Sequence, residues 1–535
     1  MLSRRDSFTY AVRNIARYGD TDVFPFPPEN HIFHDRQEDT VHLLEDMSRD
    51  LKSCIENTPP IADNTLSLVT YEGYRWVTQI DPIWNAYFLG LVLKLSPEIE
   101  RARIGTGDGV VFSHRMRIDD EKASLFADNA WNDFIERSDL LAQENNYVVT
   151  ADIADFYGHL YHHRVDNALQ DALSERIEEI AQIDLLLRRF SGGASYGLPI
   201  GGPAARILSE ATLNRVDQLL RVKGITFCRY ADDYRLFAKS QEEAYRHLYL
   251  LTESLLRHEG LSLQKQKTRV LRAGDYLRSP LFLPVDSDDL TPAERQERRF
   301  LRLSLRFDPY SSTADEDYER LQTDLQEFDI VQMLTDEVNK SRINTAVVRR
   351  LARALKVLDR DIQHAAVGTI LKSLEMLAPA LPVVLQVLSH LFPQLSEDTQ
   401  RSVTGELRRR IKDEAYFMMV PVNLAYALRV LQYENSAENV SLADKIFNLP
   451  DSPAFIQRDV VYLMYGWGRR DWISDQRRRW ANLHPWVQRA VFLASYSLLD
   501  EGSHWRRTVS LRGFDLIAKK WMDQRTKTGQ KDLRL

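Results

Sequence analysis

Residues 227–238, Phe-Cys-Arg-Tyr-Ala-Asp-Asp-Tyr-Arg-Leu-Phe-Ala, decide the fold of this 535-residue chain. Two adjacent carboxylates, Asp232 and Asp233, stand between two short runs of β-forming residues. This pattern predicts a β-hairpin with the aspartate pair at its turn. A hairpin tip holds two carboxylates rigidly, where they can bind a divalent cation such as Mg²⁺, which prefers oxygen ligands. A lone pair of aspartates is more often simple turn chemistry, so the interpretation depends on the sequence before the hairpin.

Two upstream segments supply that context. Residues 148–157 begin as an apolar, β-branched run that ends at Asp152. A carboxylate at the end of a buried strand is a poor core residue, because burying it unpaired is costly, but it is a good metal ligand. Residues 196–210 form a Gly/Pro loop that runs into an amphipathic helix, predicted over residues 205–222. Such a loop lets another backbone or a flat ligand approach closely.

Taken together, the three segments resemble the motifs of reverse transcriptases. Residues 230–233 are similar to the family's YxDD box, residues 152–157 to its first aspartate motif, and residues 197–210 to its template-and-nucleotide loop. They also occur in the family's order. The resemblance implies a right-hand polymerase with fingers and a palm, in which a ferredoxin-like β-sheet is backed by helices.

The resemblance further implies the residues that carry the chemistry. Asp152, Asp232 and Asp233 would bind two Mg²⁺ ions, with Mn²⁺ as an alternative ion, while a primer 3′-hydroxyl attacks the α-phosphate of a nucleotide. Ile153 is placed with them in the metal set. Lys267 matches a lysine proposed to protonate the leaving pyrophosphate, and the alternative is a solvated lysine that faces phosphate. The predicted catalytic set is therefore Asp152, Asp232, Asp233 and Lys267.

A second predicted set binds the incoming deoxynucleotide. Arg115 lies in residues 110–117, which resemble a finger strand whose arginine contacts the triphosphate; an arginine fork suits phosphate oxygens, and the alternative is a surface arginine. Tyr157 matches the aromatic residue that rejects a 2′-hydroxyl, and the alternative is a core tyrosine. The other members of this set are Ile153, Gly197, Pro199 and Gly201. Ile200 departs from the glutamine of intron-encoded members, which puts a polar contact there in doubt.

The rest of the chain sets the predicted architecture, which is α+β in class. We expect an N-terminal extension (1–60), fingers (61–147), the palm (148–275), a basic thumb-like connector (276–340) and an all-α, HEAT-like repeat domain (341–535). Residues 341–535 are helical by period, and the helices pair as in an α-solenoid. Residues 294–306 predict an arginine-rich helix that either follows a nucleic-acid backbone or pairs with its own glutamates.

Charge, cysteine content and hydropathy bear on the partners and the location of the protein. The net charge of −7 argues against a protein coated in nucleic acid but leaves room for a basic channel inside an acidic body. Two cysteines, Cys54 and Cys228, give no disulfide framework, which fits a reducing compartment. No apolar run reaches about 18 residues, so we expect no membrane span and a cytoplasmic location.

A palm followed by a long helical region resembles the bacterial reverse transcriptases of antiphage defence and abortive infection. That resemblance implies dNTPs and nucleic acid in an internal channel as partners, a homo-oligomer, and DNA synthesis that is template-independent or primed from a protein side chain. Two alternatives stay open. One is a templated RNA-directed DNA polymerase with a dedicated partner RNA, and the other is a non-catalytic, nucleic-acid-binding scaffold with a degenerate palm.

Overall fold

The computed structural model of the chain describes residues 1–173, 177–278, 296–297, 299–300, 321–530, 533 and 535. The region predicted to be the palm contains a four-stranded antiparallel sheet in the order β6-β7-β5-β8. The strands are β5 (Tyr147–Asp152), β6 (Thr226–Tyr230), β7 (Asp233–Ala238) and β8 (Arg269–Arg272). Strands β6 and β7 form the predicted hairpin, because Tyr230 pairs with Asp233 and leaves only Ala231 and Asp232 in the turn.

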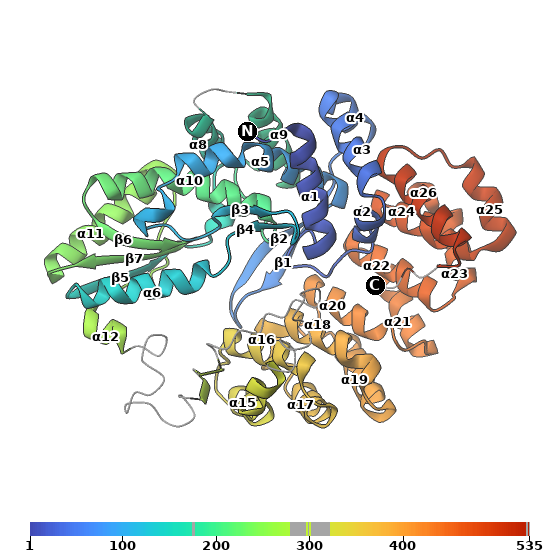
Figure 1. Ribbon diagram of the computed structural model, residues 1–535. Coiled ribbons are helices and arrows are strands. Elements are labelled where there is room, and N and C mark those ends of the chain that lie inside the picture. Colours follow the sequence, from blue (N-terminus) through green and yellow to red (C-terminus); the bar gives the residue numbers. More distant parts are fainter. Residues whose placement is uncertain (174–176, 279–295, 298, 301–320, 531–532, 534) are drawn as a thin grey trace.

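Helices cover both faces of this sheet (Figure 1). Side chains alternate along a strand, so Val149 joins the main core beside α10 (Pro203–Val222) and α11 (Gln241–Ser254). Its neighbour Val148 joins a second apolar cluster, which includes residues of α6 (Ala130–Gln143) and α12 (Ala273–Leu277). Burial on both faces explains why residues 148–151 read as an uninterrupted run of strand-forming residues.

The N-terminal part surrounds one long buried helix, α5 (Pro82–Ala102). Asp81 caps it by accepting a hydrogen bond from the Ile83 amide, and Pro82 takes the first helical position. Helix α1 packs along α5, and α10 crosses it on the palm side. The other elements of this part are α1 (Arg4–Tyr18), α2 (Asn30–Asp35), α3 (Gln37–Arg49), α4 (Leu51–Asn57), β1 (Ala62–Leu68), β2 (Tyr74–Ile80), β3 (Met116–Asp119), β4 (Ser124–Phe126), α7 (Phe156–His159), α8 (His162–Leu173) and α9 (Glu178–Phe190).

The expected finger strand over residues 110–117 is largely wrong. Strand β3 begins only at Met116 and pairs with β4. The earlier part of the segment instead joins the edge of the palm sheet, where Val111 forms an isolated bridge with Arg229. The backbone hydrogen bonds of residues 110–112 are therefore directed to β6 and not to a fingers hairpin.

The C-terminal helices form a two-row arc (Figure 1). The even-numbered helices from α16 to α26 contact one another in succession, and the odd-numbered ones from α15 to α21 do the same. These helices are α15 (Ile330–Val338), α16 (Thr345–Ala354), α17 (Arg360–Lys372), α18 (Leu381–Leu391), α19 (Glu397–Lys412), α20 (Pro421–Leu431), α21 (Ala437–Phe447), α22 (Ala454–Gly466), α23 (Arg470–Arg478), α24 (Pro485–Ala494), α25 (Leu499–Thr508) and α26 (Gly513–Lys527). Most of the arginine-rich segment 294–306 lies outside the described residues.

The arc returns to the N-terminal helices. Helix α26 packs on α2 and α3, and the Trp521 indole donates a 2.7 Å hydrogen bond to Asp35. Arg489 of α24 forms a buried ion pair with Asp81 at 2.9 Å. Residues 1–60, predicted to be an extension, thus lie between the palm half and the helical arc.

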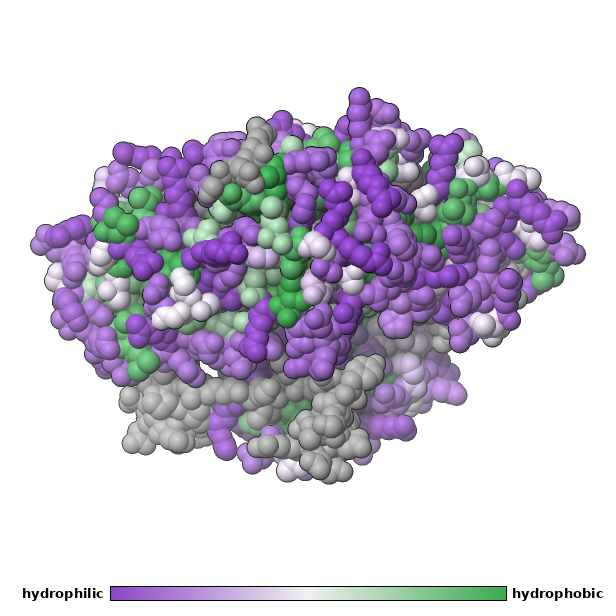
Figure 2. Space-filling view, turned by 45° about the horizontal axis from the view of Figure 1, so that its top comes forward, coloured by the Kyte–Doolittle hydropathy of each residue, from purple (hydrophilic) through white to green (hydrophobic). Residues whose placement is uncertain are grey.

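The face in Figure 2 is mostly hydrophilic, with small separate hydrophobic patches. Among the helices that the structure describes, none is long and apolar enough to cross a membrane.

Candidate active site

Three aspartates meet at one end of the palm sheet. Strand β5 pairs with β7 in a register that places Asp152 directly opposite Asp233. Asp232 lies beside them in the hairpin turn, where its carbonyl accepts a 3.1 Å hydrogen bond from the Ile153 amide. Ala231 supplies the positive φ (52°) that a two-residue hairpin turn requires. The local β-pattern of the sequence therefore brings together the carboxylates that it predicted to be partners.

The electrostatics of the cluster are those of crowded acids. Burial, followed by the charges of Asp152 and Asp233, raises the pKa of Asp232 to about 7. Burial also raises the pKa of Asp152, although Lys267 opposes that shift. Like charges held this close favour either a shared proton or a bound cation.

Lys267 is the first cation at the cluster. Its ammonium donates a 2.9 Å hydrogen bond to Asp152 Oδ2. The segment before it is fixed to the same strand, since the Gln264 amide donates to the Asp152 carbonyl at 2.7 Å. Burial alone would lower the pKa of Lys267, but the hydrogen bond and charge of Asp152 outweigh it and raise the pKa. Lys267 therefore carries its proton at neutral pH.

Arg235 is a second cation, which sequence reasoning missed. It pairs with Asp233 Oδ1 at 3.1 Å, and its guanidinium lies over the ring of Phe134. The signal was present in the sequence, because residues two apart on a strand share a face and Arg235 follows Asp233 by two.

The donors suit a hard divalent ion. No group of three or more His, Cys, Asp or Glu side chains in the described part of the chain has the spacing of a preformed metal centre. In this arrangement Lys267 and Arg235 are the cations in contact with Asp152 and Asp233. Carboxylate oxygens are the ligands that Mg²⁺ prefers, and a divalent charge would offset both the burial and the neighbouring charges that raise the pKa of Asp232.

A buried ion network supports the hairpin from below, and sequence reasoning missed it as well. Arg229 of β6 is fully buried and contacts Asp217 at 2.6 Å and Glu210 at 2.9 Å. Its Nη1 donates a 2.9 Å hydrogen bond to the carbonyl of Ala231 in the turn. Arg103 completes the network through a 2.7 Å contact with Glu210. Arg229 thus ties the aspartate-bearing turn to helix α10.

Tyr157 and the glycine loop lie on the α10 side of the cluster. Burial raises the pKa of Tyr157, to which the charges of Glu210 and Asp232 also contribute. Its carbonyl accepts a 2.8 Å hydrogen bond from the Leu198 amide, which joins the first aspartate motif to the loop.

The backbone conformation and close neighbours of the predicted loop residues Gly197, Pro199 and Gly201 are as follows. Gly197 and Gly201 have positive φ (97° and 103°), which glycine adopts without strain. The N-terminal segment covers Gly201, and a Cβ there would lie 2.3 Å from Thr21 Oγ1. Pro199 lines a small recess with the same segment.

Arg115 is not brought to the carboxylates as a free side chain. It is 6% exposed, and its guanidinium donates to the carbonyls of Val111 and Ile104 and pairs with Glu100. All three guanidinium nitrogens of Arg115 are thus bonded to groups in the region predicted to be the fingers. The arrangement favours a structural role, and the predicted triphosphate contact stays a prediction.

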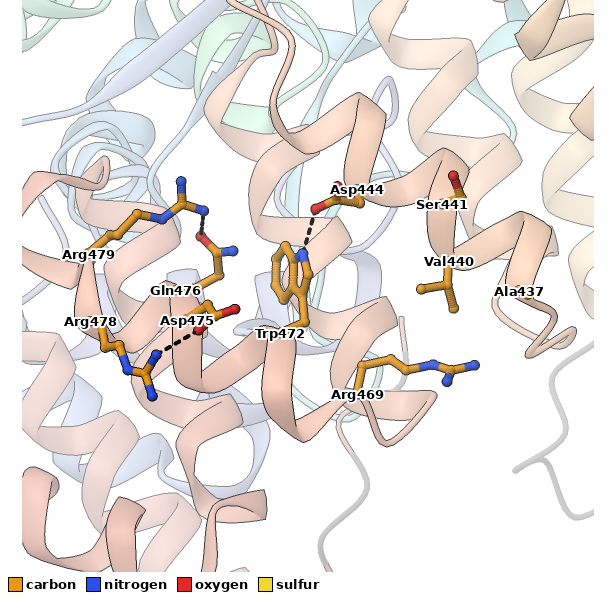
Figure 3. A pocket seen from close by; sticks show the side chains of 10 residues that line it. All are labelled: Ala437, Val440, Ser441, Asp444, Arg469, Trp472, Asp475, Gln476, Arg478 and Arg479. Carbon is orange, nitrogen blue, oxygen red and sulfur yellow. Dashed lines mark hydrogen bonds and ion pairs between the residues drawn. The ribbon is translucent and has the colours of Figure 1, made fainter.

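A pocket of about 820 Å³ lies elsewhere, between α21 and α23 (Figure 3). Trp472 points toward α21 and donates a 2.7 Å hydrogen bond to Asp444. Arg478 pairs with Asp475, and Arg479 bonds Gln476. The polar groups of this pocket are thus largely satisfied by one another.

One comparison, with a protein-family model, agrees with the geometry. Residues 113–303 match the family model described as reverse transcriptase (RNA-dependent DNA polymerase), a stretch that holds all three aspartates and Lys267. The search of curated proteins found no match. Similar solved structures include telomerase from Candida albicans with a telomeric RNA fragment (8% identity, TM-score 0.32, covering 72% of this chain and 70% of that one) and apo telomerase from Candida tropicalis (11%, 0.32, 71% and 73%).

Proposed function

We propose that the protein, an RNA-directed DNA polymerase whose residues 113–303 match the reverse transcriptase family model, extends a primer 3′-hydroxyl with dNTPs at Asp152, Asp232 and Asp233. The observation that carries this proposal is the β5–β7 register, which sets Asp152 opposite Asp233 with Asp232 in the adjacent turn. A surface that only bound nucleic acid would have no need for three converging acids, where burial and then the charges of Asp152 and Asp233 raise the pKa of Asp232 to about 7.

The proposed metal ligands are the side chains of Asp152, Asp232 and Asp233 together with the backbone at Ile153. Two Mg²⁺ ions, or Mn²⁺ in their stead, would lower the pKa of the attacking hydroxyl and stabilise charge on the triphosphate when bound. The protein's own contribution is positional, because β5 and the anchored hairpin hold the carboxylates in fixed register. Lys267 keeps a proton beside Asp152 and, in this proposal, transfers it to the departing pyrophosphate.

The nucleotide would lie between the carboxylates and the loop. We assign Tyr157 to the face under the sugar, where it would exclude a 2′-hydroxyl, and the backbone of Gly197, Pro199 and Gly201 to the neighbouring wall. The support is the hydrogen bond that joins Tyr157 to this loop and the closeness of Tyr157 to Asp232.

The wider role that we propose is bacterial antiphage defence. Its support is architectural: a palm followed by two rows of stacked helices, which we interpret as HEAT-like repeats. DNA synthesis without a template, synthesis primed from a protein side chain and copying of a partner RNA are the three modes that this role allows.

The test is incorporation of labelled dNTPs by the purified chain with Mg²⁺ or Mn²⁺, with and without a supplied primer–template. Asp232→Asn should lower incorporation by at least ~10³-fold, a loss typical of removing a group that acts on the transition state. Asp155→Asn is the matched control, since Asp155 is exposed, lies three residues after Asp152 and has a positive φ (44°) that asparagine tolerates.

The products separate the alternatives. Label that stays on protein indicates a side-chain primer, and loss of product after RNase treatment indicates a co-purified RNA template. If the parent is silent with every metal and primer–template yet still binds nucleic acid, the scaffold interpretation replaces the polymerase.

A further inference from the structure

Helix α16 carries a row of cations on one exposed face. Arg349, Arg353 and Lys356 follow at intervals of four and three residues, the spacing that aligns side chains along a helix, with Lys356 in the turn that continues α16. All three side chains are exposed, whereas Val348, Leu351 and Ala352 on the other side are buried.

These cations lack acidic partners. Within the described residues, none of Arg349, Arg353 and Lys356 has a hydrogen bond or ion pair, although most other arginines of the C-terminal arc do. Partial desolvation and then the charges of Arg75 and Arg353 lower the pKa of Arg349. The same two effects, desolvation and Arg353, lower the pKa of Lys356. Like charges are therefore crowded together, and the charge of Asp22 on Arg349 is only a smaller opposing effect.

The row of cations on α16 continues onto the β1–β2 hairpin, in the region predicted to be the fingers. The tip of the β1–β2 hairpin meets the segment before α16, where Arg342 pairs with Glu72 at 2.6 Å (Figure 1). The Tyr71 hydroxyl donates to the Met376 carbonyl at 2.5 Å, which joins the same hairpin tip to the segment after α17. Arg75, three residues along from Glu72, is exposed and has no acid partner in the part of the chain described here.

At its upper end the row approaches the palm. The charge of Asp22 acts on Arg349, and Asp22 already pairs with Arg206 of α10. The Asp22 amide donates to the Gly201 carbonyl, so this segment covers the glycine loop. The cations thus lie on the part of the helical arc that approaches the loop beside the carboxylates.

We propose that Arg75, Arg349, Arg353 and Lys356, the α16 strip, bind the phosphates of a nucleic-acid strand on its way between the palm loop and the C-terminal arc. This inference rests on the proposed polymerase function for the presence of such a strand. Unneutralised cations at regular spacing match a phosphodiester backbone, because each contact releases a counterion and no base need be read. The strip also provides the local basic path that an acidic chain of net charge −7 needs.

The experiment measures binding rather than synthesis. Fluorescence anisotropy of the full-length protein with labelled mixed-sequence DNA, RNA and an RNA–DNA hybrid gives the slope of log affinity against log salt. The variant Arg349→Gln/Arg353→Gln/Lys356→Gln should reduce that slope by about 2, at ~0.7 per lost contact to a single strand, on at least one of the three ligands. Circular dichroism should be unchanged, since all three positions are exposed.

A matched control removes the same charge from the same arc. Arg469→Gln/Arg478→Gln/Arg479→Gln neutralises the arginines of the α21–α23 pocket (Figure 3), and this variant should keep the parent's slope. Unchanged slopes for the α16 triple on all three ligands, or an equal loss in the control, would overturn the assignment. This assay reads binding without dNTPs, so a failure of the catalytic proposal, which is tested by incorporation, is read separately from a failure of this one.

Discussion

Replacing Arg229 with methionine should loosen the hairpin that carries Asp232 and Asp233. Arg229 is 0% exposed and contacts Asp217, Glu210 and the turn carbonyl of Ala231. Methionine keeps the apolar stem of the side chain. It removes the cation that pairs with the buried carboxylates of Asp217 and Glu210. Removing one partner of a buried ion pair costs about 3–5 kcal/mol.

The remaining contacts place this case at the lower end of that range. Asp217 keeps a 3.1 Å hydrogen bond from Tyr234, and Glu210 keeps its 2.7 Å contact with Arg103. We therefore expect a loss of about 3 kcal/mol in the local free energy of opening. Because 1.4 kcal/mol is a factor of about ten, amide exchange in residues 226–238 should become roughly a hundredfold faster.

Hydrogen exchange read by mass spectrometry measures that change directly, with peptides of α24 as an internal reference. The double variant Arg229→Met/Asp217→Asn should recover part of the loss, because one orphaned charge is removed as well. Incorporation of dNTPs should fall in step with the loosened hairpin, since the turn positions Asp232.

Acid should erase the difference. Burial alone would raise the pKa of Glu210, but Arg229 and then Arg103 outweigh it and hold the pKa far below its ordinary value. A carboxyl with a depressed folded pKa stabilises the fold above its unfolded pKa, about 4.5, and loses that contribution as pH falls. The parent and the Arg229 variant should therefore differ most at neutral pH, and the difference should shrink progressively as pH falls from about 4.5 toward the strongly depressed folded pKa of Glu210.

Two results would refute this reasoning. Exchange of residues 226–238 within about threefold of the parent would show that the network does not hold the hairpin. A loosened hairpin with full incorporation would show that the network contributes to stability alone and does not position the carboxylates.

Three further outcomes follow from contacts described above. Lys267→Gln should slow single-turnover incorporation by roughly 10²-fold, because the proton held beside Asp152 is lost, and equal rates would make Lys267 a bystander. Gly201→Ala should lower the thermal midpoint by several degrees, since its Cβ would meet Thr21 at 2.3 Å with φ at 103°; an unchanged midpoint would mean that the N-terminal segment moves freely. Burial raises the pKa of Glu259 to about 7. The folded state then binds the extra proton, so the parent should lose stability as pH rises from about 4.5 to 7, by up to about 3 kcal/mol, and Glu259→Gln should not.

The parts of the site that were predictable are those set by local pattern. A β-branched run ending at Asp152 and a two-residue turn at Asp232 fix strand register, and register alone places the acids together. Arg235 could have been found by the same period of two.

The remainder depended on long-range packing. Arg115 fitted a motif, yet its surroundings at Glu100 and two carbonyls bury it. The Arg229 network joins residues from β6 and α10 to Arg103, and no local pattern marks such partners. The cover of Thr21 over Gly201 likewise arises from segments 180 residues apart.

The contact of α26 with α2 and α3 can form only late in synthesis of the chain. Trp521 binds Asp35 across 486 positions, and α26 closes against α2 and α3. At about 5–20 residues per second, a ribosome needs on the order of 25–100 s to make the intervening chain. Throughout that interval α2 and α3 expose the apolar surface that α26 will cover. We therefore expect a chaperone to bind the newly made N-terminal half during this interval.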